Sequence, residues 1–405
     1  MSYPEKIEHS GDSRIPVSYG PLNTFLLLST IILVLLLPVL SSAFLAAAYS
    51  LIFILCVSIV FVNPNLFPLR ATTKVCLITC VVGYSLILTI SSIANLSTPK
   101  PDRYAQLVLI SFVFYSFTKY QWTSSNKRLC VIFLYAMLFA IWGSWFLTGM
   151  PTSEFAAFYN NSNIPGIAIF GILGLLLILS GDRMHNIVIP LLLTVPLIVF
   201  SSSRGAELAL LIAAVFSIFK KIRVSQTKKT SAWPILGVFG LIALISTQYP
   251  KLYGTDLGWR ISDLVRQYTG KNLFSGREDL WLLVIDQANS SKLIGIGPER
   301  TTSFLEILGY SAHNLYIQTF AECGYIGLVF LCSLLVILFL ELSYRGGYVC
   351  VFGQAFLLGV MIHETFEVTL TQNGLPVGLL IWVALGSAFG QADPKASCES
   401  LLISA

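Results

Sequence analysis

The sequence is poor in charged residues. Only 11% of its 405 residues are Asp, Glu, Lys or Arg, whereas 55% are hydrophobic and the mean hydropathy is +0.78. Soluble domains carry about 25% charged residues, so this composition excludes a soluble enzyme. The net charge of +5 does not indicate nucleic-acid binding, because in a membrane protein the positions of Lys and Arg matter more than their sum.

The sequence also lacks the motifs of export, metal binding and nucleotide binding. Its polar first twenty residues contain no short apolar core before a cleavage site, so no removable signal peptide is expected. The eight cysteines form no C-x-x-C pair and lie mostly in apolar segments, which predicts packed thiols. No zinc, D-x-D or phosphate-loop motif is present, and Gly295-Ile296-Gly297 predicts a turn. We therefore expect no metal and no cofactor.

Long apolar runs fill most of the chain. Stretches of about 16 to 25 apolar residues, separated by polar positions, predict about twelve membrane-spanning helices. The expected spans are 22–40, 42–62, 74–94, 104–120, 129–148, 164–180, 186–202, 205–219, 232–247, 314–341, 347–366 and 374–390. The sequence thus predicts an all-α polytopic membrane protein with both termini on one side.

The short connections between spans give the orientation. One set is rich in basic residues, whereas the opposite set holds little beyond Lys100, Arg103 and Arg204. By the positive-inside rule, the basic set and both termini face the cytoplasm. The basic set comprises Arg70, Lys74, Lys119, Lys127, Arg128, Arg183, Lys220, Lys221, Arg223, Lys228, Lys229 and Arg345.

One long polar segment interrupts the spans. Residues 248–313 are too long for a tight turn and too polar to cross a membrane, and they fall on the non-cytoplasmic side. Apolar residues at helical spacing from Trp259 to Tyr268 predict an amphipathic helix, either along the membrane surface or packed on the bundle. The expected domains are therefore 1–247 with nine spans, the loop domain 248–313, and 314–405 with three spans.

Arg204 is the first candidate for chemistry at the outer boundary of the spans. It lies in Ser203-Arg204-Gly205, where two spans meet with almost no connecting loop. An arginine here either anchors the span at the membrane edge, with Glu207 as a possible partner, or binds an anion. The second interpretation rests on the match between a guanidinium and phosphate oxygens.

Arg277 is the second candidate. Ser275 and Glu278 have capping-box spacing, which predicts that a helix begins here. The free N–H groups and the positive dipole end of a helix start favour an anion beside Arg277. A solvated surface arginine is an equal alternative.

His313 is the third candidate. It precedes Asn314 at the start of the tenth predicted span, in a charged outer loop, and neutral imidazole is the usual general base near pH 7. Another histidine, His363, lies near the outer end of the eleventh span beside Glu364 and Glu367. We interpret it as a satisfied interface histidine, with a second polar site as the alternative.

These three positions, in this order, resemble the O-antigen ligase and polymerase superfamily of bacterial membrane glycosyltransferases. The resemblance rests on Ser203-Arg204-Gly205 at a span junction, Gly276-Arg277 followed by Trp281, and His313-Asn314 opening the next span. More specifically, His313-Asn314, nine residues, Gly324, two residues and Gly327 resemble the motif of O-antigen ligases of Gram-negative bacteria.

The resemblance implies a fold like that of type C membrane glycosyltransferases and a role in lipopolysaccharide biosynthesis. A glycan would pass from undecaprenyl pyrophosphate to a sugar hydroxyl of lipid A-core, at the periplasmic face of the bacterial inner membrane. Arg204 and Arg277 would bind the pyrophosphate, and His313 would deprotonate the acceptor. Asn314 and Tyr316 would support the site. The transfer would invert the anomeric centre without a metal or cofactor, and the partners would be this donor, this acceptor and membrane lipids.

Three alternative functions remain at this point, one of which is a flippase or a structural lipid-binding protein that would not need a histidine at the membrane boundary. An O-antigen polymerase of the same superfamily would use the same donor with a lipid-linked repeat unit as acceptor. A secondary transporter, from a different class, also has about twelve spans, but transporters place charged residues near mid-membrane on broken helices. Here the charged residues gather in one outer loop and at span ends, which favours an enzyme.

Overall fold

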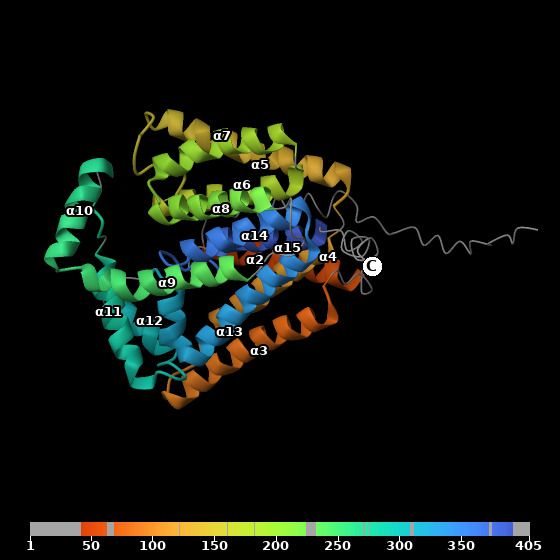
Figure 1. Ribbon diagram of the computed structural model, residues 1–405. Helices are drawn as coiled ribbons and strands as arrows, with labels where there is room; N and C mark the ends of the chain where they lie inside the picture. Colours follow the sequence, from red (N-terminus) through yellow and green to blue (C-terminus); the bar gives the residue numbers. More distant parts are fainter. Residues whose placement is uncertain are drawn as a thin grey trace, which may run out of the picture.

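The computed structural model describes residues 42–62, 69–120, 122–159, 161–181, 183–223, 232–269, 272–274, 276–307, 312–371 and 375–391. Every regular element within these ranges is a helix, which confirms the predicted all-α class. The predicted span 22–40 and both termini lie outside the described residues. Figure 1 shows long helices side by side in a bundle, with the shorter α10, α11 and α12 gathered at one end.

Eleven of the predicted spans coincide with helices. Six of these helices, α3, α5, α6, α7, α9 and α13, are long and apolar enough to cross a membrane, as expected of a multi-pass membrane protein; the count of twelve stays a prediction. The bounds are α2 (Ser42–Val62), α3 (Ala71–Ala94), α4 (Pro101–Lys119), α5 (Ser124–Leu147), α6 (Asn163–Ser180), α7 (Met184–Ser201), α8 (Arg204–Arg223), α9 (Trp233–Leu252), α13 (Leu315–Arg345), α14 (Gly347–His363) and α15 (Leu375–Gln391).

The bundle has central and peripheral helices. α6, α14 and α15 are buried on almost all sides. α3, in contrast, buries Tyr84 and Leu88 but exposes Ile78 and Val82. An apolar side chain that faces outward suits lipid, because hydrocarbon does not expel it as water does. The thiols also follow the sequence prediction, since most cysteines of the described ranges are buried, namely Cys56, Cys80, Cys130, Cys323 and Cys350.

The polar segment between α9 and α13 is helical as well. It contains α10 (Asp256–Thr269), which confirms the predicted amphipathic helix, followed by α11 (Arg277–Ala288), the short 3₁₀ helix η1 (Asn289–Ser291) and α12 (Pro298–Ile307). α11 packs on the bundle through Trp281, which is 1% exposed and donates a hydrogen bond from Nε1 to the carbonyl of Ala312 at 2.8 Å. Packing rather than disulfides therefore holds this part of the segment.

α14 ends earlier than the sequence predicted. The expected span reached residue 366, but the helix ends at His363, and most of the following residues to Thr371 are buried without being helical. The carboxylate of Glu364 accepts hydrogen bonds from the backbone N–H groups of Thr369 and Leu370 at 3.0 and 3.1 Å. These bonds replace the lost helical partners, which an irregular backbone inside a membrane protein requires. We call residues 364–371 the buried turn.

Candidate functional site

The three candidate residues lie at the starts of three helices. Arg204 is the first residue of α8, Arg277 is the first of α11, and His313 lies two residues before α13. All three helix starts contact the beginning of the buried turn. Gly205 packs against the side chains of His363 and Phe366, so the structure brings together elements that are far apart in the sequence.

Glu367 of the buried turn connects two of the candidates. Its Oε2 lies 2.7 Å from Nδ1 of His313, and its Oε1 accepts a hydrogen bond from Nη2 of Arg277 at 3.3 Å. Nη1 of Arg277 also donates to the carbonyl of Phe366 at 2.6 Å. Asn163, the first residue of α6, donates from Nδ2 to Oε1 at 3.3 Å. We call Asn163, Arg277, His313 and Glu367 the Glu367 cluster.

The environment of Glu367 keeps its carboxylate ionised. Burial raises the pKa of Glu367, but the hydrogen bond with His313 and the electrostatic interactions with His313, Arg277 and His363 lower it more. The pKa of Glu367 therefore lies below its ordinary value of 4.5. An ionised oxygen beside Nδ1 favours the imidazole tautomer that carries its proton on Nδ1, so Nε2 is the nitrogen that can accept a proton.

His313 itself has an unusual backbone, which its neighbours fix. Its φ is 47°, in the left-handed region that a residue other than glycine rarely adopts. Asn314 caps α13, since its Oδ1 accepts hydrogen bonds from the backbone N–H groups of Tyr316 and Ile317 at 3.0 Å. The N–H of Leu315 donates to the carbonyl of Glu364 at 2.8 Å. The chain is thus held immediately after His313, which orients the imidazole toward Glu367.

The two supporting residues have different places. Asn314 is fully buried and also donates from Nδ2 to Oγ of Ser246 in α9 at 3.2 Å. Tyr316 turns into the bundle, where its hydroxyl donates to the carbonyl of Met361 in α14 at 2.9 Å. Asn314 therefore adjoins the Glu367 cluster, whereas Tyr316 ties α13 to α14 away from it.

Arg204 joins the site through the loop domain. Its Nη1 donates to the carbonyls of Asn272 and Leu273 at 2.8 and 2.6 Å. The hydroxyl of Tyr249 lies within hydrogen-bond distance of the same Leu273 carbonyl, at 2.8 Å, and of Oε1 of Glu278, at 2.6 Å, and its single proton serves one of these acceptors. Arg204 and Tyr249 therefore share one carbonyl neighbour, and the guanidinium of Arg204 is directed at the loop domain.

The predicted start of α11 is confirmed, and the residue before it is Gly276, which adopts a left-handed φ of 81° and has no side chain to cap the helix. Ser275 lies outside the described residues, so the predicted capping box stays a prediction. Glu278 is fully buried, and its Oε1 lies 2.6 Å from the hydroxyl of Tyr249.

The interpretation of His363 was correct in part. The side chain is fully buried between α14 and the start of α8, as expected for an interface histidine. Oε1 of Glu364 lies 3.5 Å from its Nδ1. Among the described residues neither ring nitrogen has a hydrogen-bond partner, so the expectation of a satisfied histidine is wrong.

The glycine motif after His313 has a structural role. Gly324 interrupts α13 with a φ of 63°, and a Cβ there would lie 2.4 Å from the carbonyl of Leu293. Gly295 lies on the facing backbone segment and has a φ of 76°. A Cβ at Gly295 would lie 2.5 Å from the backbone nitrogen of Cys323. Two backbones therefore cross here in contact, which only glycine permits. The predicted turn at Gly295 is thus confirmed.

Sequence reasoning missed Glu367, Asn163 and Tyr249 as members of the site. The available signal for Glu367 was an acidic residue in a short polar break between two apolar spans, on the predicted side of His313. Asn163 and Tyr249 carried no comparable signal, because a polar residue at a span end is common.

A comparison with known families agrees with the motif-based resemblance. Residues 189–332 match the family model described as O-Antigen ligase. This range begins within α7, ends within α13 and contains Arg204, Arg277 and His313. The match supports an O-antigen ligase family assignment. No curated protein matches the chain.

Proposed function

From this family assignment, we propose that the protein is an O-antigen ligase that transfers a glycan from undecaprenyl pyrophosphate to a sugar hydroxyl of lipid A-core. One observation carries the proposal. The ionised carboxylate of Glu367 contacts both the candidate base His313 and the candidate cation Arg277, which is the arrangement that a proton transfer beside an anionic leaving group requires.

His313 acts as the general base in this proposal. Glu367 holds the Nδ1 proton, and Nε2 takes the proton of the acceptor hydroxyl. The hydroxyl oxygen forms a bond to the anomeric carbon, the bond from that carbon to the pyrophosphate oxygen breaks, and its electron pair leaves with undecaprenyl pyrophosphate. Attack opposite the leaving group inverts the anomeric centre in one displacement.

Arg204 and Arg277 bind the pyrophosphate. Both stand at helix starts, where the dipole and the free N–H groups add positive potential. Within the described residues, Arg204 donates hydrogen bonds from Nη1 and Arg277 donates from Nη1 and Nη2, and each guanidinium has five N–H donors. The remaining donors can meet phosphate oxygens. Since pyrophosphate is already a good leaving group, these cations suffice to receive its developing charge without an obligatory metal.

The active site faces the periplasm in this proposal. The helices α10 to α12 of the loop domain 248–313 lie at one end of the bundle (Figure 1), and α11 begins at Arg277 of the Glu367 cluster. The basic connections belong to the other end, which the positive-inside rule assigns to the cytoplasm. The two membrane parts, 1–247 and 314–405, then span the bacterial inner membrane, and donor and acceptor both reach the site from the periplasmic leaflet.

The test uses a Gram-negative strain that lacks this protein, with lipopolysaccharide resolved by size. We expect bare lipid A-core and retained lipid-linked polymer, restored to a full ladder by wild type but not by Arg204→Ala, Arg277→Ala or His313→Ala at equal membrane abundance. Arg266→Ala is the matched control, because Arg266 is an exposed arginine of α10. Lipid A-core with single repeat units would instead indicate a polymerase, and an unchanged ladder would contradict both.

A further inference from the structure

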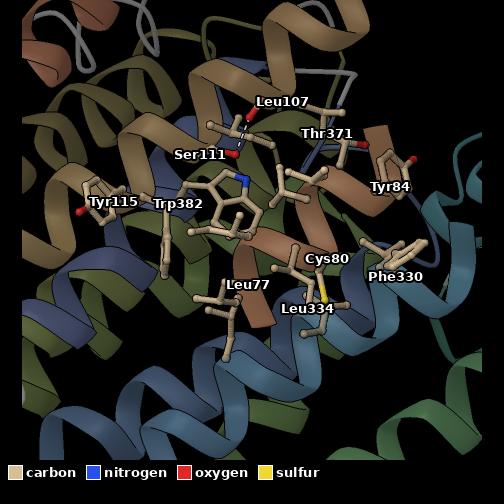
Figure 2. A pocket seen from close by; sticks show the side chains of 18 of the residues that line it. Leu77, Cys80, Tyr84, Leu107, Ser111, Tyr115, Phe330, Leu334, Thr371 and Trp382 are labelled. Carbon is tan, nitrogen blue, oxygen red and sulfur yellow. Dashed lines mark hydrogen bonds between the residues drawn. The ribbon is translucent and has the colours of Figure 1, made fainter. Parts of the chain in front are cut away.

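A large apolar cavity lies inside the bundle, away from the Glu367 cluster. It has a volume of about 510 Å³ and is lined by residues of α3, α4, α13 and α15. Figure 2 shows Leu77, Leu334 and Trp382 around its middle. Ile78 and Val82 of α3 also line it and are 63% and 58% exposed, so one side of the cavity faces the surrounding lipid.

The end of the cavity nearest the Glu367 cluster borders a much smaller void. Tyr84 and Thr371 mark this end in Figure 2, and Thr371 is the last described residue of the buried turn. The second void, beside Arg103 and Glu322, has a volume of only about 10 Å³, which is room for about one water molecule. A hydrocarbon chain does not fit into this second void.

The charged side chains at this Tyr84 end of the cavity carry no net charge. Nη2 of Arg103 lies 3.7 Å from Oε1 of Glu322, and both side chains are largely buried. Nε2 of Gln318 donates to the same Oε1 at 3.0 Å. One cation and one anion thus compensate each other here, and this end offers no net charge to a lipid headgroup.

The opposite end of the cavity is positively charged. Lys74 of α3 lines it, and so does Tyr115 of α4 (Figure 2). The ammonium group of Lys119, a residue that is 5% exposed, lies 4.8 Å from the centre of the Tyr115 ring. The nearby Glu341 is bonded by both Arg70 and Arg345, so one carboxylate faces two guanidinium groups. Cations therefore exceed anions where the cavity approaches this end of the bundle.

We propose that this cavity binds an acyl chain of an anionic phospholipid from the leaflet at the Lys74 end, with the lipid phosphate between Lys74 and Lys119. A lining made almost wholly of carbon accepts a hydrocarbon chain, and an unfilled cavity of this size forfeits dispersion contacts. Basic residues at the cytoplasmic ends of membrane helices attract anionic headgroups. This site is distinct from that of the proposed glycan transfer, because none of the residues that line the cavity belongs to the Glu367 cluster.

Native mass spectrometry of the purified full-length protein tests the proposal, with phosphatidylglycerol and phosphatidylethanolamine of identical acyl chains as probes. We expect phosphatidylglycerol to bind more tightly, and Lys74→Gln to weaken it about fivefold. Leu334→Trp, which fills the cavity, should abolish binding of both probes. Lys127→Gln is the matched control, since Lys127 is a half-buried lysine of α5 that does not line the cavity, and it should change binding less than twofold.

Three results would overturn the proposal. The first is equal affinity for the two phospholipids, and the second is an equal loss in Lys74→Gln and Lys127→Gln. The third is displacement of phosphatidylglycerol by undecaprenyl phosphate, which would make the prenyl chain of the donor the occupant. Because Leu334→Trp could destabilise the bundle, its elution volume and Tm are compared with those of wild type, and Lys74→Gln alone decides the charge dependence.

Discussion

At the scale of single residues, the site depends on a carboxylate that acts through its neighbours. Glu367 contacts His313, Arg277 and Asn163, which come from three separate elements. A buried carboxylate that accepts hydrogen bonds from one cationic and two polar neighbours is stabilised in its charged form. The charge of Glu367, more than its shape, should therefore determine how readily His313 accepts a proton.

Glu367→Gln should test this charge, because glutamine keeps the size of the side chain. We expect kcat for glycan transfer to fall about 10- to 100-fold, less than the roughly 100- to 10,000-fold loss expected for His313→Ala. The change in KM for the acceptor should be small. Glu306→Gln, at an exposed position of α12, is the control and should retain wild-type kcat; equal kcat in the two glutamine variants would remove Glu367 from the mechanism.

The ionised Glu367 should also make stability depend on pH. Its pKa in the folded protein lies below the ordinary value of 4.5, so its contribution is fully present above pH 4.5 and is lost as the pH falls through the lowered pKa. Thermal unfolding of wild type and Glu367→Gln between pH 7 and pH 3 measures this. The difference in Tm should be largest at pH 7 and should shrink below pH 4.5, and a constant difference would contradict the ion-pair interpretation.

At the scale of elements, the backbone crossing at Gly324 fixes the first part of α13, which follows His313. Gly324 and Gly346 have nearly the same backbone conformation, with φ values of 63° and 69° and ψ values of −162° and −169°. A Cβ at Gly324 would collide with Leu293, whereas a Cβ at Gly346 meets nothing within 4 Å. Comparing alanine substitutions at these two glycines therefore separates the free-energy cost of the dihedral angles from that of the collision with Leu293.

Gly324→Ala should therefore destabilise the protein more than Gly346→Ala. The unfavourable φ costs about 1 to 3 kcal/mol in both variants, and the collision with the Leu293 carbonyl adds to it at residue 324 only. Denaturant unfolding in detergent gives both free energies of unfolding. Equal losses would show that the crossing relaxes without cost, and the close contact would then not explain the glycine.

At the scale of the whole molecule, two polar clusters lie at opposite ends of an apolar bundle. α13 begins beside the Glu367 cluster and ends, 31 residues long, at a second cluster around Glu341. There Oε2 of Glu341 accepts from Arg70 and Thr73 at 2.8 and 2.7 Å, and Oε1 accepts from Arg345 at 3.1 Å. The second cluster fastens α3, α13 and α15 together far from the proposed chemistry.

Glu341→Ala should accordingly reduce stability rather than catalysis. It leaves Arg345, which is 6% exposed, without its carboxylate, and removing one member of a buried ion pair costs about 3 to 5 kcal/mol. Thermal unfolding in detergent and kcat at a temperature where the variant is folded should separate the two effects. A large loss of kcat with an unchanged Tm would contradict a purely structural role.

Much of the fold could be predicted because it depends on patterns within short stretches of the sequence. Apolar runs and polar breaks gave the all-α class and helices at eleven predicted spans, and helical spacing gave α10. A helix boundary was missed at His363, because Glu364 ends that helix through contacts inside the protein. Hydropathy does not register such contacts, since an apolar residue looks the same in a helix and in a buried turn.

The sequence by itself therefore determined the membrane helices, the polar segment and three candidate residues at helix starts. Only the tertiary structure joined them, because His313, Arg277 and Asn163 meet Glu367 across 54, 90 and 204 residues of chain. Periodicity and composition act within one helix. Which helix ends meet depends on how all the helices pack, and that packing decided the protonation of Glu367, the partners of Arg204 and the lining of the apolar cavity.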